Sequence, residues 1–173
     1  TDYDTVIEQM LTPAHFGYDP NAQWNAYDPE TARKLVEAAG LPANTSLQLA
    51  TSPNFDQSVM QAIQQMLGDI GLPVEIELTD HATFVRKISS EASQQAMLYV
   101  GRWSCAGCGD ADGVMWPLLH SKSTWSAFRN AEADELLDAA RQTIDQTKRL
   151  EIYGQVNKIV ADQVPLVPIH QNS

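Results

Sequence analysis

The residue types best suited to chemistry lie in one stretch, residues 99–113, which reads YVGRWSCAGCGDADG. Its two cysteines, Cys105 and Cys108, have the C-x-x-C spacing, and Trp103 comes two positions before the first of them. Two aspartates follow the second cysteine. A cysteine pair of this spacing can exchange disulfides, bind a metal ion or close into a local disulfide. A tryptophan in a glycine-rich loop can instead line a binding cleft.

Thiol–disulfide exchange is one interpretation of the pair, and an oxidoreductase that uses Cys105 and Cys108 is the alternative function. A thioredoxin-type motif needs a helix that starts at the first cysteine, because the helix N-terminus lowers the pKa of the thiol. Gly107 and Gly109 lie on either side of the second cysteine and oppose a helix. Three predicted helices also follow the motif, where a redox domain would return to strands.

Metal binding and a local disulfide are the other two interpretations. A closed zinc site needs four ligands. The sequence adds only His120, twelve residues beyond Cys108, so we predict no metal and no cofactor. A Cys105–Cys108 disulfide would contribute about 2 kcal/mol through chain entropy. It would hold the shape of the loop and requires an oxidising compartment. Two buried free thiols are equally compatible with these residues.

Four residues of the loop are candidates for contact with an organic ligand. Trp103 offers a large flat face and one N–H donor, with core packing as the alternative role. Arg102 could pair with a carboxylate, although exposure on the surface is its expected state. Ser104 and Asp110 add a hydroxyl and a carboxylate. No serine–histidine–aspartate set, phosphate loop or carboxylate pair indicates catalysis, so we predict a protein that is not an enzyme.

Three residues after the loop have structural expectations. Asp112 directly precedes an apolar segment and is expected to be the N-cap of a helix. Trp116 and Trp125 are expected to be packing residues. Asp110 could cap the same helix instead of contacting a ligand, and the sequence leaves these two roles open.

Strands and helices alternate along the chain, which predicts a mixed, mainly parallel sheet with helices on both faces. Asp28 and Pro29 begin a helix that ends at Gly40. A strand–helix–strand pattern over 46–79 predicts a parallel pair. The predicted strands after the first helix cover 46–51, 74–79 and 96–101. The predicted helices after it cover 55–70, 80–91, 112–119, 131–144 and 147–162.

The loop with Trp103 leaves the carboxyl end of the strand predicted over 96–101, where ligands usually bind in α/β sheets. The opening residues TDYDTVIEQML have a helical pattern. PLVPIH near the end predicts an edge strand or an exit strand, because its prolines exclude a fully paired central position. Both ends look cut, so we expect a piece of a longer protein.

Composition excludes two classes of partner. The chain has 173 residues, of which 43% are hydrophobic, enough for one domain with a sizeable core. Lys and Arg total 11 against 22 Asp and Glu, a formal net charge of -11. Such acidity argues against binding to nucleic acid or to an anionic membrane surface. No segment approaches the roughly 18 consecutive apolar residues of a membrane span.

Four segments, in this order, resemble family 5 extracellular solute-binding proteins, the peptide- and nickel-binding receptors of ABC importers. YDPETARKLVEAAGLP is similar to the family's DPxKAxxLLxEAG signature, and VEIELTDHATFVRKI to its strand followed by a helix with a central aromatic. GRWSCAGCGDADGVMWPLLHS resembles its tryptophan loop, W-x-x-D-x-x-D-P-D before an apolar helix. The chain from Arg129 onward resembles its closing pair of helices and strand. The resemblance begins at about Tyr18.

The resemblance implies that residues 1–173 form a single α/β lobe, the C-terminal lobe of a type II periplasmic-binding-protein-like fold. A missing N-terminal lobe would supply the other half of the pocket. The implied function is non-catalytic capture of a peptide-like, opine or similar small organic solute, with ABC permease subunits as partners. The implied location is periplasmic, or extracytoplasmic and membrane-anchored, in a bacterium. Export in turn favours the Cys105–Cys108 disulfide.

The resemblance also assigns roles to single residues. Trp103 matches the tryptophan that lines the pocket in peptide-binding members, and Asp110-Ala111-Asp112 matches D-P-D with alanine in place of proline. Peptide binders commonly place an acid three residues after the tryptophan to pair with the ligand's amino terminus, but Ala106 stands there. A buried ammonium without a partner is costly. Either Asp110 serves instead, or the ligand lacks that amine, as in opines, modified peptides or sugars.

Overall fold

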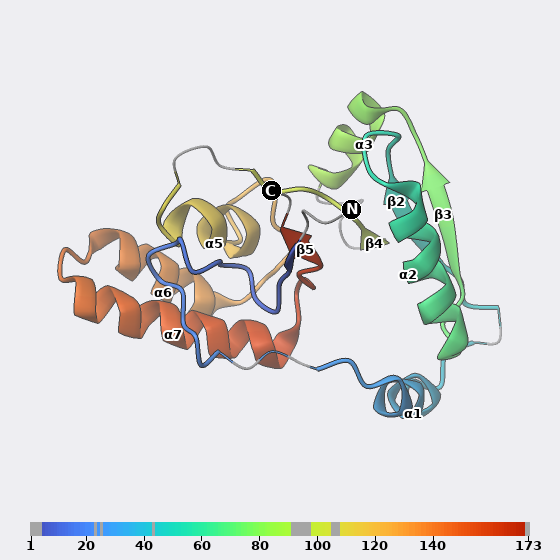
Figure 1. Cartoon of the computed structure of the whole chain (residues 1–173), viewed down its shortest axis with the longest axis horizontal. Coiled ribbons are helices and arrows are strands. Elements are labelled where there is room, and N and C mark those ends of the chain that lie inside the picture. Colours follow the sequence, from blue (N-terminus) through green and yellow to red (C-terminus); the bar gives the residue numbers. More distant parts are fainter. Residues whose placement is uncertain are drawn as a thin grey trace. The chain divides into compact units, whose positions relative to one another are not determined.

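The computed structural model describes residues 5–22, 24, 26–42, 44–90, 98–104 and 108–171 (Figure 1). Its strands are β1 (Thr5–Val6), β2 (Leu47–Thr51), β3 (Val74–Leu78), β4 (Leu98–Tyr99) and β5 (His170–Gln171). Its helices are α1 (Pro29–Ala39), α2 (Gln57–Asp69), α3 (His81–Ile88), α5 (Asp112–Leu119), α6 (Ala131–Gln142) and α7 (Gln146–Gln163). The predicted α/β class is confirmed, and these elements fall into two compact units. Unit 1 comprises Thr1–Asn25 and Trp103–Ser173, and unit 2 comprises Ala26–Arg102.

Most helices begin where a short polar side chain accepts a hydrogen bond from the first turn. Asp28 accepts from the backbone N–H of Thr31, and Gly40 ends the same helix in the left-handed conformation, as predicted. Because such caps act within a few residues, the sequence locates helix starts well. The same type of cap begins the later helices at Asp56, Asp80, Asn130 and Asp145.

Unit 2 is built on the predicted strand–helix–strand motif. β2 pairs in parallel with β3, and on its other side with β4, giving the order β3-β2-β4. Residues 96–97 of the strand predicted over 96–101 lie outside the described residues. Of the described part, only Leu98–Tyr99 forms a strand, β4. The parallel pairing predicted for β2 and β3 is therefore confirmed over all five residues of each strand.

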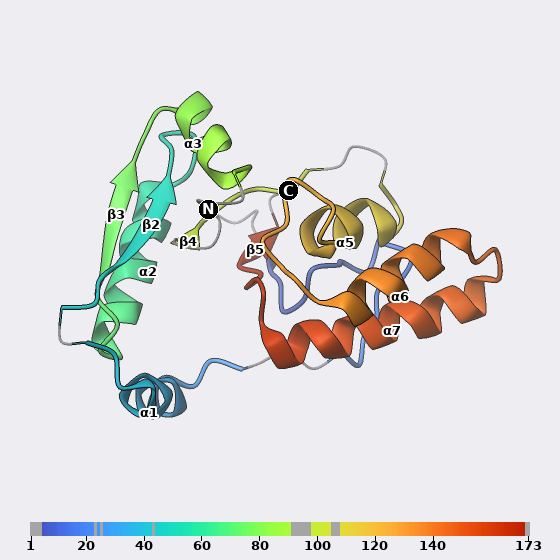
Figure 2. The same ribbon diagram turned by 180° about the vertical axis from the view of Figure 1, so that it is seen from behind.

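Helices cover both faces of this sheet, as predicted. Neighbouring residues of a strand point to opposite faces. Leu49 packs with Met60 of α2, whereas the next residue, Ala50, packs with Phe84 and Ile88 of α3. α2 lies in front of β2 and β3 in Figure 1 and behind them in Figure 2. Each apolar face of the sheet is thus removed from water by its own helix.

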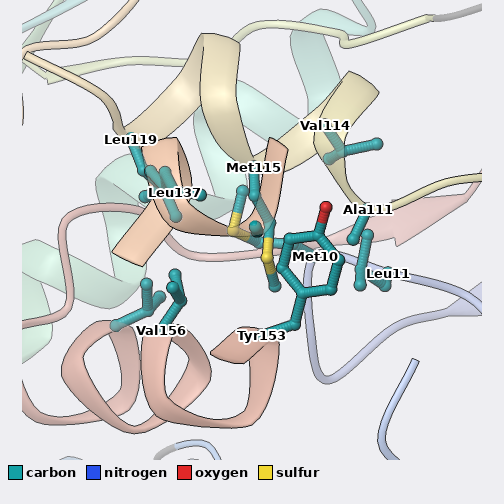
Figure 3. Close-up of a cluster of buried hydrophobic side chains, with 11 residues drawn as sticks. Met10, Leu11, Ala111, Val114, Met115, Leu119, Leu137, Tyr153 and Val156 are labelled. Atoms are coloured by element: carbon teal, nitrogen blue, oxygen red, sulfur yellow. The ribbon is translucent and has the colours of Figure 1, made fainter. Parts of the chain in front are cut away.

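Unit 1 packs α5, α6 and α7 around a second core, which the segment 8–24 helps to close. Figure 3 shows Tyr153 rising from α7 toward Ala111 and Leu11. All three side chains are buried. The buried residues of this core are Met10, Leu11, Ala111, Val114, Met115, Leu119, Leu137, Ala140, Tyr153, Val156 and Val160.

The two ends of the chain differ from their predictions. The helix expected near the start is wrong, because Thr5–Val6 is a strand and residues 8–11 are bends. β1 pairs antiparallel with β5, and Met10 and Leu11 are buried in the core of unit 1 by tertiary packing rather than by a helix. The strand expected over PLVPIH is wrong for most of its length, because pairing starts only at His170.

Gly17 allows the segment 8–24 to lie close to α5, and its replacement tests that packing. Its φ is +98°, and a Cβ atom there would lie 2.6 Å from the Cβ of Ala111 and 3.1 Å from Tyr153. We expect Gly17→Ala to lower the free energy of unfolding by about 2–4 kcal/mol through overlap and backbone strain. Urea unfolding followed by circular dichroism measures this change.

The control is Gly154→Ala in the same unit. Among the described residues, a Cβ at Gly154, inside α7, would meet no atom beyond the backbone of its own helix within 4 Å. Alanine should therefore raise stability by about 0.5–1 kcal/mol through helix propensity. Equal effects of the two substitutions would contradict the packing of Gly17 against Ala111.

Candidate functional site

Trp103 lies at the surface of unit 1 in a fixed orientation. Its indole Nε1–H donates a hydrogen bond of 2.9 Å to the backbone carbonyl of Gly113. Its ring meets that of Trp125 edge-to-face, with centroids 6.2 Å apart and planes at 68°. The residue remains 36% exposed. An indole held by one hydrogen bond, with its face open, can contact an organic ligand without first becoming ordered.

Asp110 is held by Arg149 in a two-point ion pair. The guanidinium donates from Nη1 to Oδ2 at 3.0 Å and from Nη2 to Oδ1 at 2.9 Å. The Tyr153 hydroxyl donates to Oδ1 at 3.3 Å, and the backbone N–H of Asp112 donates to it at 2.9 Å. Paired guanidinium–carboxylate contacts are the stronger kind of charged hydrogen bond. The carboxylate therefore joins the loop to α7.

These contacts change the ionisation of both acids in the group. Partial burial opposes the charge on Asp110, but the hydrogen bonds from Arg149, Asp112 and Tyr153 outweigh it. The pKa of Asp110 is therefore lower than its ordinary value of 3.8. Burial, and then the negative charge of Asp110, raise the pKa of Tyr153 to about 12. At neutral pH the group is a carboxylate, a guanidinium and a neutral phenol.

The backbone of Phe16, in the segment 8–24, forms hydrogen bonds with the same loop. The N–H of Phe16 donates to the carbonyl of Gly109 at 2.7 Å, and the N–H of Ala111 donates back to Phe16 at 2.8 Å. The Phe16 ring also lies 5.1 Å from the Arg149 guanidinium. Alanine at position 111, where the resembled motif has proline, thus supplies an N–H that proline lacks. The loop end is fixed on two sides.

Asp112 does not have its predicted role as the N-cap. It is the first residue of α5, and no side chain caps that helix. Its carboxylate instead pairs with Arg141 of α6, at 2.6 Å from Nε and 3.1 Å from Nη2. The Asp110 carboxylate accepts a hydrogen bond from the backbone N–H of Asp112, the first residue of α5. Asp110, whose role the sequence left open, therefore makes the side-chain contact at the start of this helix. Arg141 also lies 4.0 Å above the ring of Trp116.

The two acid–arginine pairs line a shallow cavity of about 430 Å³ beside the loop. Gly113 belongs to both features, because its carbonyl accepts from Trp103 and its backbone lines the cavity. Each positive charge in the lining is matched by a carboxylate. The lining residues are Cys108, Asp110, Asp112, Gly113, Arg141 and Arg149.

The cysteine motif lies only partly within the described residues. Cys108 is disulfide-bonded and half-buried, whereas Cys105, the other cysteine of the sequence, lies outside the described residues. His120, considered as a third metal ligand, is fully buried after α5. Its Nδ1 accepts from the backbone of Lys122, and its Nε2 lies 3.2 Å from a carboxylate oxygen of Asp138. The described residues contain no group of three side chains that could hold a metal ion.

The other predicted residues have simpler positions. Arg102 and Ser104 are exposed, and Trp116 is half-buried against His120, as expected for a packing residue. The packing role expected for Trp125 is wrong, because it is 37% exposed. The described part of the chain contains no helix with both the length and the apolar character needed to cross a membrane.

Sequence reasoning missed Arg149, which lies 39 residues from Asp110 along the chain. Its helix was predicted, but nothing local distinguishes this arginine from its neighbours. It also missed the backbone bridge between Phe16 and Ala111. Both omissions have one cause, since the contacts join residues far apart in sequence.

The sequence profile of a known family matches residues 1–126 of the chain. The family is described as bacterial extracellular solute-binding proteins, family 5 Middle. The glutathione-binding protein GsiB of Salmonella paratyphi A is 29% identical over 171 residues, covering 92% of this chain and 33% of that protein. The chain thus spans about a third of the length of the curated relatives that it matches.

Solved structures share the fold over nearly the whole chain. The ABC transporter substrate-binding protein CtaP of Listeria monocytogenes has a TM-score of 0.88 at 20% identity, covering 99% of this chain and 35% of that one. DppA of Helicobacter pylori, in complex with the peptide STSA, has a TM-score of 0.86 at 20% identity, covering 98% of this chain and 34% of that one. AgaA of A. tumefaciens R10, in complex with agropinic acid, has a TM-score of 0.83 at 23% identity, covering 99% of this chain and 36% of that one. These neighbours confirm the predicted type II periplasmic-binding-protein fold.

Replacing Asp110 tests whether its pair with Arg149 stabilises unit 1. We expect Asp110→Asn to lower the free energy of unfolding by about 1–2 kcal/mol at neutral pH. Because the folded pKa of Asp110 is lowered, its contribution is present above 3.8 and is lost as the pH falls below it. Urea unfolding at about pH 7 and about pH 3 measures the difference, which should be smaller at the lower pH.

Lys122→Ala is the control for this charge change. The Lys122 side chain is 74% exposed and lies 3.8 Å from Asp138, so its ion pair is screened by solvent. Its removal should leave stability unchanged within error at both pH values. A difference between Asp110→Asn and the native chain that persists unchanged in acid would show that the ion pair is not its source.

Proposed function

Since the chain belongs to the bacterial extracellular solute-binding proteins of family 5, we propose that it is a ligand-binding part of an ABC importer's receptor. In this proposal residues 1–173 are the C-terminal lobe of a two-lobed protein, and both compact units belong to that lobe. The lobe captures a small organic solute without chemical change. The receptor works outside the cytoplasmic membrane, in the periplasm or anchored to the membrane surface, and delivers its solute to permease subunits.

The exposed, oriented indole of Trp103 is the observation that carries this proposal. An apolar ring of this size is normally buried in the core or in an interface. Here the hydrogen bond to Gly113 and the anchored loop end hold it in place at the surface. A rigid aromatic surface loses little entropy when it binds, so its contact energy appears as affinity. The cavity lined by balanced ion pairs lies next to it.

The mechanism that we propose is closure of two lobes over the solute. A solute that touches both lobes stabilises the closed form by its greater affinity for that form. This lobe would contribute Trp103, with Arg102 and Ser104 as exposed polar groups on the same loop. Asp110 is held by Arg149, and the backbone of Ala111 is held by Phe16. Closure would therefore move the lobes and leave this end of the loop in place.

The proposed solute is peptide-like or opine-like. Relatives and neighbours include a glutathione-binding protein and proteins in complex with a peptide or with agropinic acid. Asp110 already forms two hydrogen bonds with Arg149, so we assign it to positioning the loop rather than to an ammonium group. With alanine at position 106, this lobe then offers no carboxylate to a free amine at that point, which favours opines and modified peptides.

The alternative function, a thiol–disulfide oxidoreductase, gains no support. The relatives and structural neighbours of this chain are solute-binding proteins. The role that we propose for a Cys105–Cys108 disulfide is to hold the loop in shape.

Removal of the indole tests the proposed function directly. In the full-length receptor we expect Trp103→Ala to weaken binding of its solute about tenfold or more, because an aromatic contact is lost. Isothermal titration calorimetry with glutathione, the peptide Ser-Thr-Ser-Ala and agropinic acid provides the measurement. Tyr27→Ala is the control, because this tyrosine is 76% exposed in unit 2. Unchanged affinity in Trp103→Ala would remove this tryptophan from the site.

Thiol labelling tests the proposed disulfide. When the protein without substitutions is denatured in the absence of a reductant, neither cysteine should react with iodoacetamide. After reduction both should react, which mass spectrometry detects as two added labels. Native protein that takes up two labels before reduction would show two free thiols. The double variant Cys105→Ser/Cys108→Ser should lose about 2 kcal/mol of stability.

A further inference from the structure

Trp125 is a second exposed tryptophan that the proposed function leaves without a role. It is 37% exposed and meets Trp103 edge-to-face at 6.2 Å. Within the described part of the chain, its indole N–H has no hydrogen-bond acceptor. The N–H of Trp103, in contrast, is already bound to Gly113. The pair therefore presents two partly exposed rings, and one of their two N–H donors has no acceptor among the described residues.

The backbone around Trp125 is tied down even though the side chain is exposed. Ser123 and Ser126, on either side of it, are buried. The backbone N–H of Trp125 donates to the Ser123 hydroxyl at 3.2 Å, and the N–H of Phe128 donates to the Ser126 hydroxyl at the same distance. The N–H of Ser123 donates to the carbonyl of His120 at 2.9 Å. These turns fix where the indole is presented.

The two rings form an angled apolar surface. Their planes meet at 68°, so a group placed against both touches one ring on each of two sides. Such a corner fits a branched or ring-shaped apolar group better than a charged one, since it gains from the removal of apolar area from water. The free N–H of Trp125 can donate to a carbonyl or carboxylate at the edge of that group.

We propose that Trp103 and Trp125 together form an apolar subsite for one side chain of the solute. The inference rests on the proposed function and adds a specificity to it. The subsite selects solutes with a leucine-sized or aromatic group and an acceptor oxygen beside it. Trp125 is then a specificity-determining residue, because the ring that it adds turns one flat surface into a corner.

The test compares solutes that differ only in one side chain. With the full-length receptor, calorimetry is carried out on the dipeptides Ala-Ala, Ala-Leu and Ala-Phe, and on glutathione with its S-methyl and S-benzyl thioethers. We expect the native receptor to prefer the larger member of the series that it binds by about tenfold. Trp125→Ala should reduce that preference to less than about twofold, and Trp125→Phe should keep most of it.

Two further variants test whether both rings contact the same group of the solute. Ile144→Ala, at a residue 96% exposed in the same unit, should leave the preference unchanged. In the double variant Trp103→Ala/Trp125→Ala, the loss for the larger solute should be smaller than the sum of the two single losses, because both rings contact one group. Thermal unfolding of each variant confirms that the fold is kept.

The remaining outcomes overturn the inference. An equal loss of affinity for every member of a series would mean that Trp125 contacts protein, such as the other lobe, rather than the side chain. An unchanged preference in Trp125→Ala would reject the subsite and leave the proposed function in place. A native receptor that binds agropinic acid but no dipeptide and no glutathione derivative would have the same two consequences. A native receptor that binds none of these solutes would reject the proposed function, and the subsite with it.

Discussion

The ion pair between Asp110 and Arg149 fixes the position of the candidate site. A loop that contains several glycines has many conformations of similar energy, and ordering it costs free energy for every residue held. The pair offsets part of that cost at one end of the loop, where the guanidinium of α7 binds both carboxylate oxygens. The backbone bridge to Phe16 holds the same end from the other side. These contacts therefore fix the end of the loop from which α5 begins.

The same constraint explains why two large apolar rings can remain at the surface. Trp103 is oriented by Gly113, the second residue of α5, and the position of α5 is set by Asp110 and by the pair Asp112–Arg141. Trp125 is presented by turns whose serines are buried. Exposing an indole forfeits burial free energy of a few kcal/mol. That free energy is recovered when a ligand covers the ring, so it contributes to affinity. This is the reason for proposing a binding site at these two tryptophans.

The departure from the resembled D-P-D element has a physical consequence in this structure. Ala111 is fully buried, and its N–H donates to Phe16. Proline would remove that donor, so the alanine gives the opening segment an additional connection to the loop. The close approach also requires glycine at position 17, whose φ of +98° disfavours a side chain. Loop, opening segment and α7 therefore form one packed group around Tyr153.

Interactions within a few residues were predictable from the sequence by itself. The cap at Asp28, the strand–helix–strand of unit 2 and the closing helices all follow from local hydrogen bonds and hydrophobic periodicity, and each is confirmed. The sequence also indicated Trp103 as the residue to examine, and its resemblance indicated the family. These features were accessible because the residues that determine them are neighbours in the chain.

Only the tertiary structure decided which partner each loop residue has. Asp112 pairs with Arg141, 29 residues away, and Asp110 with Arg149, 39 residues away. The opening segment forms a strand and a buried loop because β5 and the core of unit 1 are available to it. Trp125 is exposed although Ser123 and Ser126, close to it in the chain, are buried. Long-range pairing and burial depend on how elements meet in space, and a local pattern does not contain that information.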